Sequence, residues 1–160
     1  MIVNHGQSQQ YHYEILGVNS RLDSIQAAIL KVKLKHLDNY AAARNKAAAY
    51  YDKAFAGNSK IKTPVQAKNS SHVFHQYTLT LNGVDRNKLK EHLASKEIPS
   101  MIYYPVALHS QKAYLNKTNE GKKYPVTEKL CDSVISLPMH TELDEETLNY
   151  ITTSVLEFIK

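Results

Sequence analysis

A polar turn leads into a long helical pattern in the stretch Gly17-Val18-Asn19-Ser20-Arg21-Leu22-Asp23-Ser24-Ile25-Gln26-Ala27-Ala28-Ile29-Leu30. Ser20 is the predicted N-cap, because its hydroxyl can accept hydrogen bonds from the free N–H groups of a first turn. A helix start of this kind attracts anions through those N–H groups and the positive end of the helix dipole. Asn19 and Arg21 lie beside it and could help to hold a phosphate. The alternative interpretation is an ordinary turn and cap.

The helical pattern continues from Arg21 to about Ala56 without a proline or glycine, and Gly57 then supplies a stop. About 35 residues at 1.5 Å each predict a rod on the order of 50 Å long. One small core cannot cover such a rod, so we expect residues 21–57 to form a linker between domains or a helix shared with a partner chain. Residues 1–20 are expected to be irregular and to continue from something upstream.

Residues 58–160 alternate predicted strands and helices. Strands are predicted at 72–81, 101–104 and 136–139, and amphipathic helices at 85–96, from Pro125 to about Val134, and from Leu143 to the C-terminus. Asp85 is a predicted N-cap, and acidic residues open the last helix. The predicted fold is therefore α/β, with a long helix followed by a small αβ sandwich.

Composition limits the class of protein. One domain is the natural expectation for 160 residues, and no run of about 18 apolar residues exists that could cross a membrane. The first residues lack the charged and apolar regions of a secretory signal, and the single Cys131 suits a reducing cytoplasm. We interpret Cys131 as a small buried packing residue. The net charge of +5 suits an anionic ligand or weak nucleic-acid contact, and alone it does not decide between them.

Candidate binding residues gather near one predicted strand end. Tyr103, Tyr104 and His109 lie on a strand and the loop that follows it, where binding residues tend to collect. Aromatic packing is the alternative for this cluster. No metal site is predicted, because the closest histidine pair, His72 and His75, points to opposite faces of a strand.

Five stretches together resemble one family, the DegT/DnrJ/StrS group of pyridoxal-phosphate-dependent nucleotide-sugar aminotransferases. The matching residues are Asn4-His5-Gly6, Gly17-Val18-Asn19-Ser20-Arg21-Leu22-Asp23-Ser24-Ile25-Gln26-Ala27-Ala28, His75-Gln76-Tyr77, Tyr103-Tyr104-Pro105-Val106-Ala107-Leu108-His109, and Ser136-Leu137-Pro138-Met139-His140. They occur in the family's order and span nearly the whole chain. The resemblance is greatest to members that act on UDP-linked amino sugars for lipopolysaccharide or glycan synthesis.

The resemblance covers only the last two-fifths of such an enzyme, which corresponds to the C-terminal small domain of type I, aspartate-aminotransferase-like enzymes. It implies that residues 1–20 continue from a missing N-terminal large domain, that residues 21–57 form a linker and dimer helix, and that residues 58–160 form the small domain. The lysine that carries the cofactor belongs to the large domain, so this chain contributes no catalytic residue and is expected to be inactive alone.

By the same resemblance, Asn19 reaches across a homodimer interface to the cofactor phosphate of the other subunit. Arg21 approaches the diphosphate of the sugar nucleotide, and Tyr103, Tyr104 and His109 line the sugar-nucleotide site, although the family often has histidine where Tyr103 stands. In the complete enzyme, glutamate would donate the amino group and a keto sugar would receive it.

The leading hypothesis is thus the C-terminal portion of a cytoplasmic, homodimeric sugar-nucleotide aminotransferase. A non-catalytic regulatory or binding domain derived from the same fold is the alternative. A nucleic-acid-binding module is the third possibility, and no recognition motif supports it.

Overall fold

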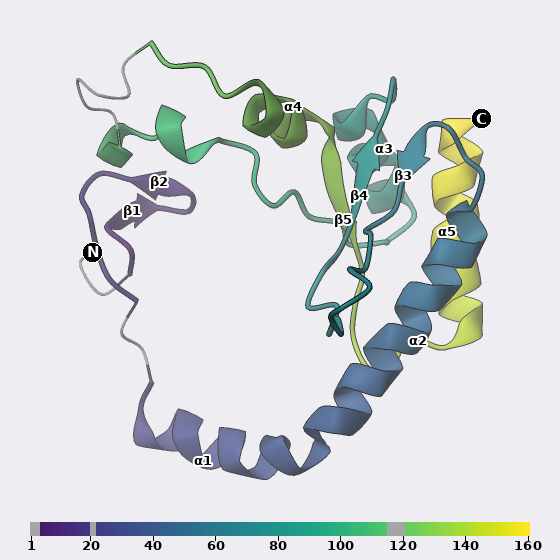
Figure 1. The fold of residues 1–160 in the computed structure, drawn as a ribbon, viewed down its shortest axis with the longest axis horizontal. Helices are drawn as coiled ribbons and strands as arrows, with labels where there is room; N and C mark the ends of the chain where they lie inside the picture. Colours follow the sequence, from purple (N-terminus) through teal and green to yellow (C-terminus); the bar gives the residue numbers. More distant parts are fainter. Residues whose placement is uncertain (1–3, 20–21, 115–120) are drawn as a thin grey trace.

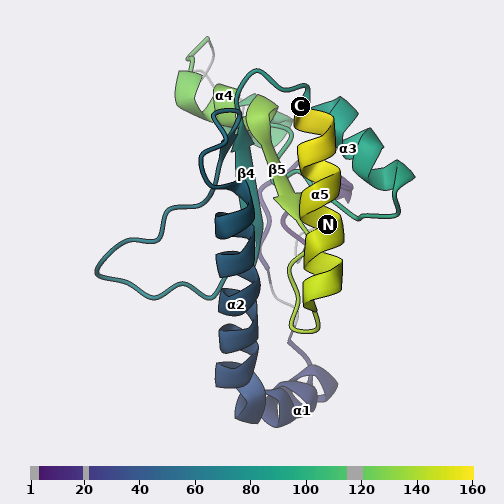
Figure 2. The same cartoon turned by 90° about the vertical axis from the view of Figure 1, so that its right-hand side faces the viewer.

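The computed structural model describes residues 4–19, 22–114 and 121–160. The chain contains a three-stranded antiparallel sheet in the order β3-β4-β5, formed by Ile61–Lys62, Tyr77–Leu81 and Val134–Leu137 (Figure 1). The register pairs Tyr77 with Leu137 and Leu81 with Ile61. Helices α2 (Leu37–Phe55) and α5 (Glu145–Ile159) lie side by side, and α3 (Arg86–Ser95) packs on α5 (Figure 2). The predicted α/β fold class, a long helix followed by a small αβ domain, is confirmed.

The hydrophobic core lies between these helices and the sheet. Inward positions of β4 alternate with partly exposed ones, which is the period-2 pattern of a strand with one buried face. The largest fully buried side chains of the core are Tyr51, Phe55, Tyr77, Leu79, Leu89, Leu93, Ile135 and Val155. The Tyr77 hydroxyl donates to Asp52 Oδ1 at 2.5 Å, and burial, followed by this contact, raises the pKa of Tyr77 well above its ordinary value.

The helices of the domain were predictable from caps and periodicity. Asp85 caps α3 and Asp144 caps α5, each accepting from backbone N–H groups of the first turn. Helix α4 (Pro125–Ser133) begins at Pro125, as expected from the tolerance of proline at the first helical position. These three predicted helices are confirmed.

The strands are shorter than predicted. Residues 72–76 do not join β4, because Arg44 Nη1 donates to the carbonyls of Phe74 and His75 at 3.1 and 3.2 Å and holds them against α2. The predicted strand at 101–104 is reduced to one bridge between Met101 and Ser136. The last predicted strand begins two residues earlier than expected, at Val134, and all four of its residues are buried.

The expected rod over residues 21–57 is not one helix. Helix α1 (Ser24–Lys33) ends at a 3₁₀ turn, η1 (Leu34–His36), and α2 begins after it, so the two helices point in different directions (Figure 1). Ser20 lies outside the described residues. The described N-cap is Asp23, whose carboxylate accepts from Gln26 N at 2.8 Å in a capping box. The helix therefore starts later than predicted.

Helix α1 has no buried residue, and it lies at the far end of α2, away from the sheet (Figures 1 and 2). Its exposed large apolar side chains continue into η1 and the start of α2; they are Ile25, Ile29, Leu30, Val32, Leu34 and Leu37. A helix of this length is marginal in water without a packing partner. Among the described residues, nothing covers the apolar side chains of α1.

The N-terminal segment is more regular than predicted. Residues 4–19, here called the hairpin, contain the two-stranded ladder of β1 (Gln7–Gln9) and β2 (His12–Tyr13), and Asn4 pairs with Asn19 at the open end. Gly6 is essential to this turn: its φ is +78°, and a Cβ there would stand 1.7 Å from the carbonyl oxygen of Ile15. Only glycine fits at this position.

Candidate functional site

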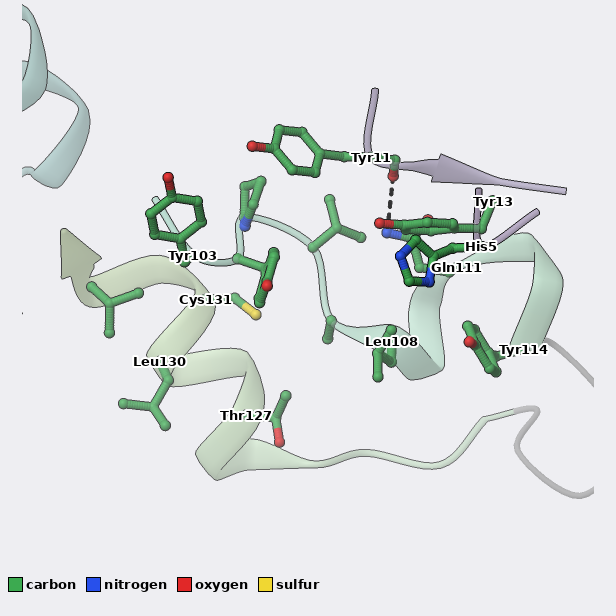
Figure 3. A pocket seen from close by; sticks show the side chains of 15 residues that line it. His5, Tyr11, Tyr13, Tyr103, Leu108, Gln111, Tyr114, Thr127, Leu130 and Cys131 are labelled. Carbon is green, nitrogen blue, oxygen red and sulfur yellow. Dashed lines mark hydrogen bonds between the residues drawn. The ribbon is translucent and has the colours of Figure 1, made fainter. Parts of the chain in front are cut away.

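An aromatic cavity of about 570 Å³ lies between the hairpin, helix α4 and a segment here called the strap, residues 103–114 (Figure 3). The strap contains two 3₁₀ turns, η2 (Leu108–Ser110) and η3 (Lys112–Tyr114). The lining includes the side chains His5, Tyr11, Tyr13, Tyr103, Tyr104, Tyr114, Leu130 and Cys131. A cavity of this size and lining is typical of a small-molecule site.

The hairpin supplies one wall because its turns direct aromatic residues to one side. Tyr11 has a positive φ of 67° at the tip, and Glu14 N donates to the carbonyl of Gly6 at 3.1 Å to close the loop. Figure 3 shows His5, Tyr11 and Tyr13 on the hairpin side of the cavity, across from Leu130 and Cys131 of α4. Cys131 is half-buried and lines the cavity. The prediction that it is a buried packing residue is therefore wrong.

The strap supplies the opposite rim. The rings of Tyr103 and Tyr104 meet edge to face with their centroids 5.8 Å apart, and both line the cavity. Tyr104 is 61% exposed, so its ring face is available to a ligand. The two tyrosines predicted as binding residues are thus brought together in the cavity.

His109 is turned away from the cavity lining. Its Nε2 lies 3.4 Å from Glu128 Oε1, and its ring packs on Tyr124 with centroids 4.7 Å apart. The same Glu128 oxygen accepts from Tyr124 N at 2.9 Å. Because η2 rotates successive side chains, Leu108 faces the cavity while His109 fastens the strap to the start of α4.

Asn19 lies four residues before Asp23, the N-cap of α1. Asn19 is exposed at the open end of the hairpin, and it is not among the lining residues of the cavity. Arg21 lies outside the described residues. The Asp23 carboxylate caps the first turn of α1, so the N-cap is Asp23 and not Ser20. Phosphate binding by Asn19 and Arg21 stays a prediction.

The lining determines what the cavity can hold. No Asp, Glu, Lys or Arg lies among the described residues that line it. Tyrosine faces and hydroxyls surround it, so it suits an uncharged ring that can stack and accept hydrogen bonds, such as a sugar or a nucleobase. Across residues 4–19, 22–114 and 121–160, no group of three or more His, Cys, Asp or Glu is placed to hold a metal ion, and no helix is long and apolar enough to cross a membrane.

Sequence reasoning missed part of this site. His5 was noted only within a stretch that resembles the family, and the sequence assigned no role to Tyr11, Tyr13 or Gln111. Gln111 is 8% exposed and lines the cavity. Its partner is a backbone carbonyl far away in the chain, which no local pattern reveals.

The fold of the described chain is that of part of a solved aminotransferase. The chain belongs to the DegT/DnrJ/EryC1/StrS aminotransferase family, whose profile matches residues 1–156.

Three relatives illustrate the match. The chain is 38% identical to the "pleiotropic regulatory protein" of Geobacillus stearothermophilus over 98% of its own length and 42% of that protein. It is 40% identical to the UDP-N-acetyl-3-dehydro-alpha-D-glucosamine 3-aminotransferase of Acidithiobacillus ferrooxidans, covering 95% of this chain and 40% of the relative. A crystal structure of a DegT/DnrJ/EryC1/StrS aminotransferase from Brucella abortus superposes with a TM-score of 0.75 at 33% identity, covering 98% of this chain and 41% of that one. The chain thus spans about two-fifths of the length of these proteins.

Proposed function

We propose that the chain is the C-terminal portion of a pyridoxal-phosphate-dependent aminotransferase that moves an amino group from glutamate to a nucleotide-linked keto sugar, in cell-surface polysaccharide biosynthesis such as that of lipopolysaccharide. The observation that carries the proposal is the aromatic cavity, because it is built from two of the stretches that resemble the family, at residues 4–6 and 103–109. The named reaction of the Acidithiobacillus ferrooxidans relative supports a UDP-linked amino sugar as the substrate class.

Residue roles follow from the chemistry of the lining. Tyr103 and Tyr104 contact the sugar nucleotide directly, through ring faces and hydroxyls. His109 does not contact the substrate in this proposal. It supports the wall that carries Tyr103 and Tyr104, because it fastens the strap to α4 through Glu128. Arg21 provides the positive charge for the diphosphate, which the uncharged cavity lacks.

Pyridoxal phosphate supplies the electron-accepting ring on which amino transfer depends. The fit of this chain to that group is limited to the phosphate: the Asn19 side chain is exposed at the open end of the hairpin, and a neutral amide can donate to a phosphate oxygen. Asn19 reaches the cofactor of a second subunit in a homodimer. The chain does not supply the cofactor lysine, so it is inactive by itself.

The exposed apolar surface of α1 supports a division of the chain into three segments that belong to a larger protein. Residues 1–20 continue from an N-terminal large domain, residues 21–57 link the domains and contribute to the dimer, and residues 58–160 form the small domain. Because α1 buries none of its residues here, the larger assembly would cover its exposed leucines and isoleucines. We place the enzyme in the cytoplasm, where nucleotide sugars are made.

The test compares two proteins. The chain alone, mixed with pyridoxal phosphate and dialysed, is expected to retain no cofactor absorbance and to transfer no amino group from ¹⁵N-glutamate to a UDP-linked keto sugar. The same residues joined to a lysine-bearing large domain of the family are expected to do both. Retained cofactor or transfer by the chain alone would contradict the assignment, as would an inactive joined protein that has folded.

A non-catalytic regulatory or binding domain is the second candidate. The name of the Geobacillus stearothermophilus relative favours it, since that protein is described as a regulator. The joined protein decides between the two: a regulator would bind the sugar nucleotide without transferring the amino group.

A further inference from the structure

A buried side-chain amide joins the hairpin to the strap. Gln111 Nε2 donates to the carbonyl oxygen of Tyr11 at 3.3 Å, joining residues that are 100 positions apart in the chain (Figure 3). A side-chain amide at 8% exposure that bonds to a distant backbone carbonyl fixes both segments at once.

The amide itself is held in place by the strap. Gln111 N donates to the carbonyl of Leu108 at 3.0 Å, and Tyr114 N donates to the carbonyl of Gln111 at 2.9 Å. These two hydrogen bonds fix the backbone N–H and carbonyl of Gln111 independently of its side-chain bond to the hairpin. The donor is preorganised, so forming the side-chain bond costs little additional conformational entropy.

The contact stands between two hollows. One is the aromatic cavity of about 570 Å³, and the other is a hollow of about 520 Å³ lined by the hairpin and the strap. Gln111 and Tyr11 line both. The bond between them therefore lies where the walls of the two hollows meet.

We propose that Gln111 is the positioning residue that clamps the hairpin onto the strap and thereby sets the width of the aromatic cavity for the sugar nucleotide; this rests on the proposed function for the ligand, although the clamp itself does not. Gln111 does not need to touch the reacting atoms. It acts through the backbone carbonyl of Tyr11 and so positions the hairpin, whose Tyr11 and Tyr13 line the cavity across from α4 (Figure 3).

The test uses the 160-residue chain with Gln111→Met, which keeps the side-chain volume and removes the donor, and Gln111→Glu, which keeps the length and lacks an N–H donor at neutral pH. The matched control is Gln66→Met, because Gln66 Nε2 also donates to a backbone carbonyl, that of Ser70 at 3.2 Å, in an exposed loop. Three quantities are measured: amide hydrogen exchange in the hairpin, the urea midpoint of the core, and the affinity for UDP-N-acetylglucosamine as the probe.

Both Gln111 variants are expected to speed exchange of the Glu14 amide and to weaken probe binding by about three- to tenfold, the loss that follows from one ordinary hydrogen bond. The urea midpoint and the Gln66 control are expected to match the wild type. A purely structural role would instead shift the urea midpoint together with binding.

Unchanged exchange in the hairpin would overturn the clamp, and faster exchange with unchanged probe affinity would overturn its positioning role. If the wild-type chain does not bind the probe, the proposed function loses its substrate site. Faster hairpin exchange in the Gln111 variants would then still establish the clamp.

Discussion

Replacement of Gly6 by alanine should open the hairpin and leave the core intact. An added Cβ would stand 1.7 Å from the carbonyl oxygen of Ile15, and real Cβ contacts essentially never fall below 3.0 Å. The Ile15 carbonyl would have to retreat by about 1.3 Å. The adjacent hydrogen bond from Glu14 N to the Gly6 carbonyl, now 3.1 Å long, would not survive such a displacement.

The magnitude follows from two contributions. A positive φ costs an alanine about 1–2 kcal/mol, and the lost hydrogen bond adds about 1 kcal/mol. The hairpin would thus lose about 2–3 kcal/mol of local stability, which corresponds to roughly 30-fold or faster exchange of the Glu14 amide. The core cluster of the described residues runs from Ala47 to Ile159, so its unfolding free energy should not change.

Gly83→Ala is the matched control. Gly83 also has a positive φ, +67°, but nothing lies within 4 Å of an added Cβ. It should cost the core about 1 kcal/mol in urea unfolding and leave the hairpin unaffected. Hydrogen exchange together with urea denaturation measures both effects. Wild-type exchange at Glu14 in Gly6→Ala, or a core as destabilised as in Gly83→Ala, would refute this reasoning.

Further predictions concern the cavity, the core and a helix cap. Tyr104→Ala should weaken binding of UDP-N-acetylglucosamine about tenfold, through loss of ring stacking, whereas Tyr104→Phe should retain most of the affinity; equal affinities in titration would contradict the assigned contact. Tyr77→Phe removes the hydrogen bond to Asp52 and should cost about 1 kcal/mol in urea unfolding, while an unchanged midpoint would show that the bond contributes nothing. Hydrogen bonds from Thr147 in the first turn of α5 hold the pKa of the Asp144 carboxyl below its ordinary value. The ionised carboxylate therefore stabilises the fold at any pH above the ordinary pKa, and this stabilisation is lost as the pH falls through the lowered pKa. Asp144→Ala should therefore lower stability at neutral pH and flatten its acid dependence, with exposed Asp132→Ala as the control, and an unaltered pH profile would refute the role of the cap.

Helix caps and the spacing of apolar residues predicted most of the helices in residues 58–160. Asp85 was recognisable as a cap, and acidic residues marked the start of the last helix, whose cap is Asp144. Leucines and isoleucines that follow at helical spacing are buried as expected. These features depend on neighbours a few residues away, so they are visible in the sequence. The interruption at Leu34–His36 was not visible, because the run contains neither proline nor glycine.

The site was predicted only in part. Tyr103 and Tyr104 could be identified because they end the predicted strand at 101–104 and precede Pro105. His109 could not be oriented, since a single 3₁₀ turn decides which side of the strap it faces. The hairpin residues and Gln111 depend on contacts between distant segments, and positive φ values at Gly6 and Tyr11 shape a loop that composition describes only as polar.

The 3₁₀ turn at Leu34–His36 separates two helices with unequal protection. Helix α2 is anchored by Tyr51 and Phe55 in the core, whereas α1 has no such anchor. In the chain alone, trypsin should cut at Lys31, Lys33 or Lys35 long before it attacks the far end of α2, because cleavage follows the population of locally opened backbone. Limited digestion would therefore leave a resistant fragment that begins near the start of α2 and extends to the C-terminal helix.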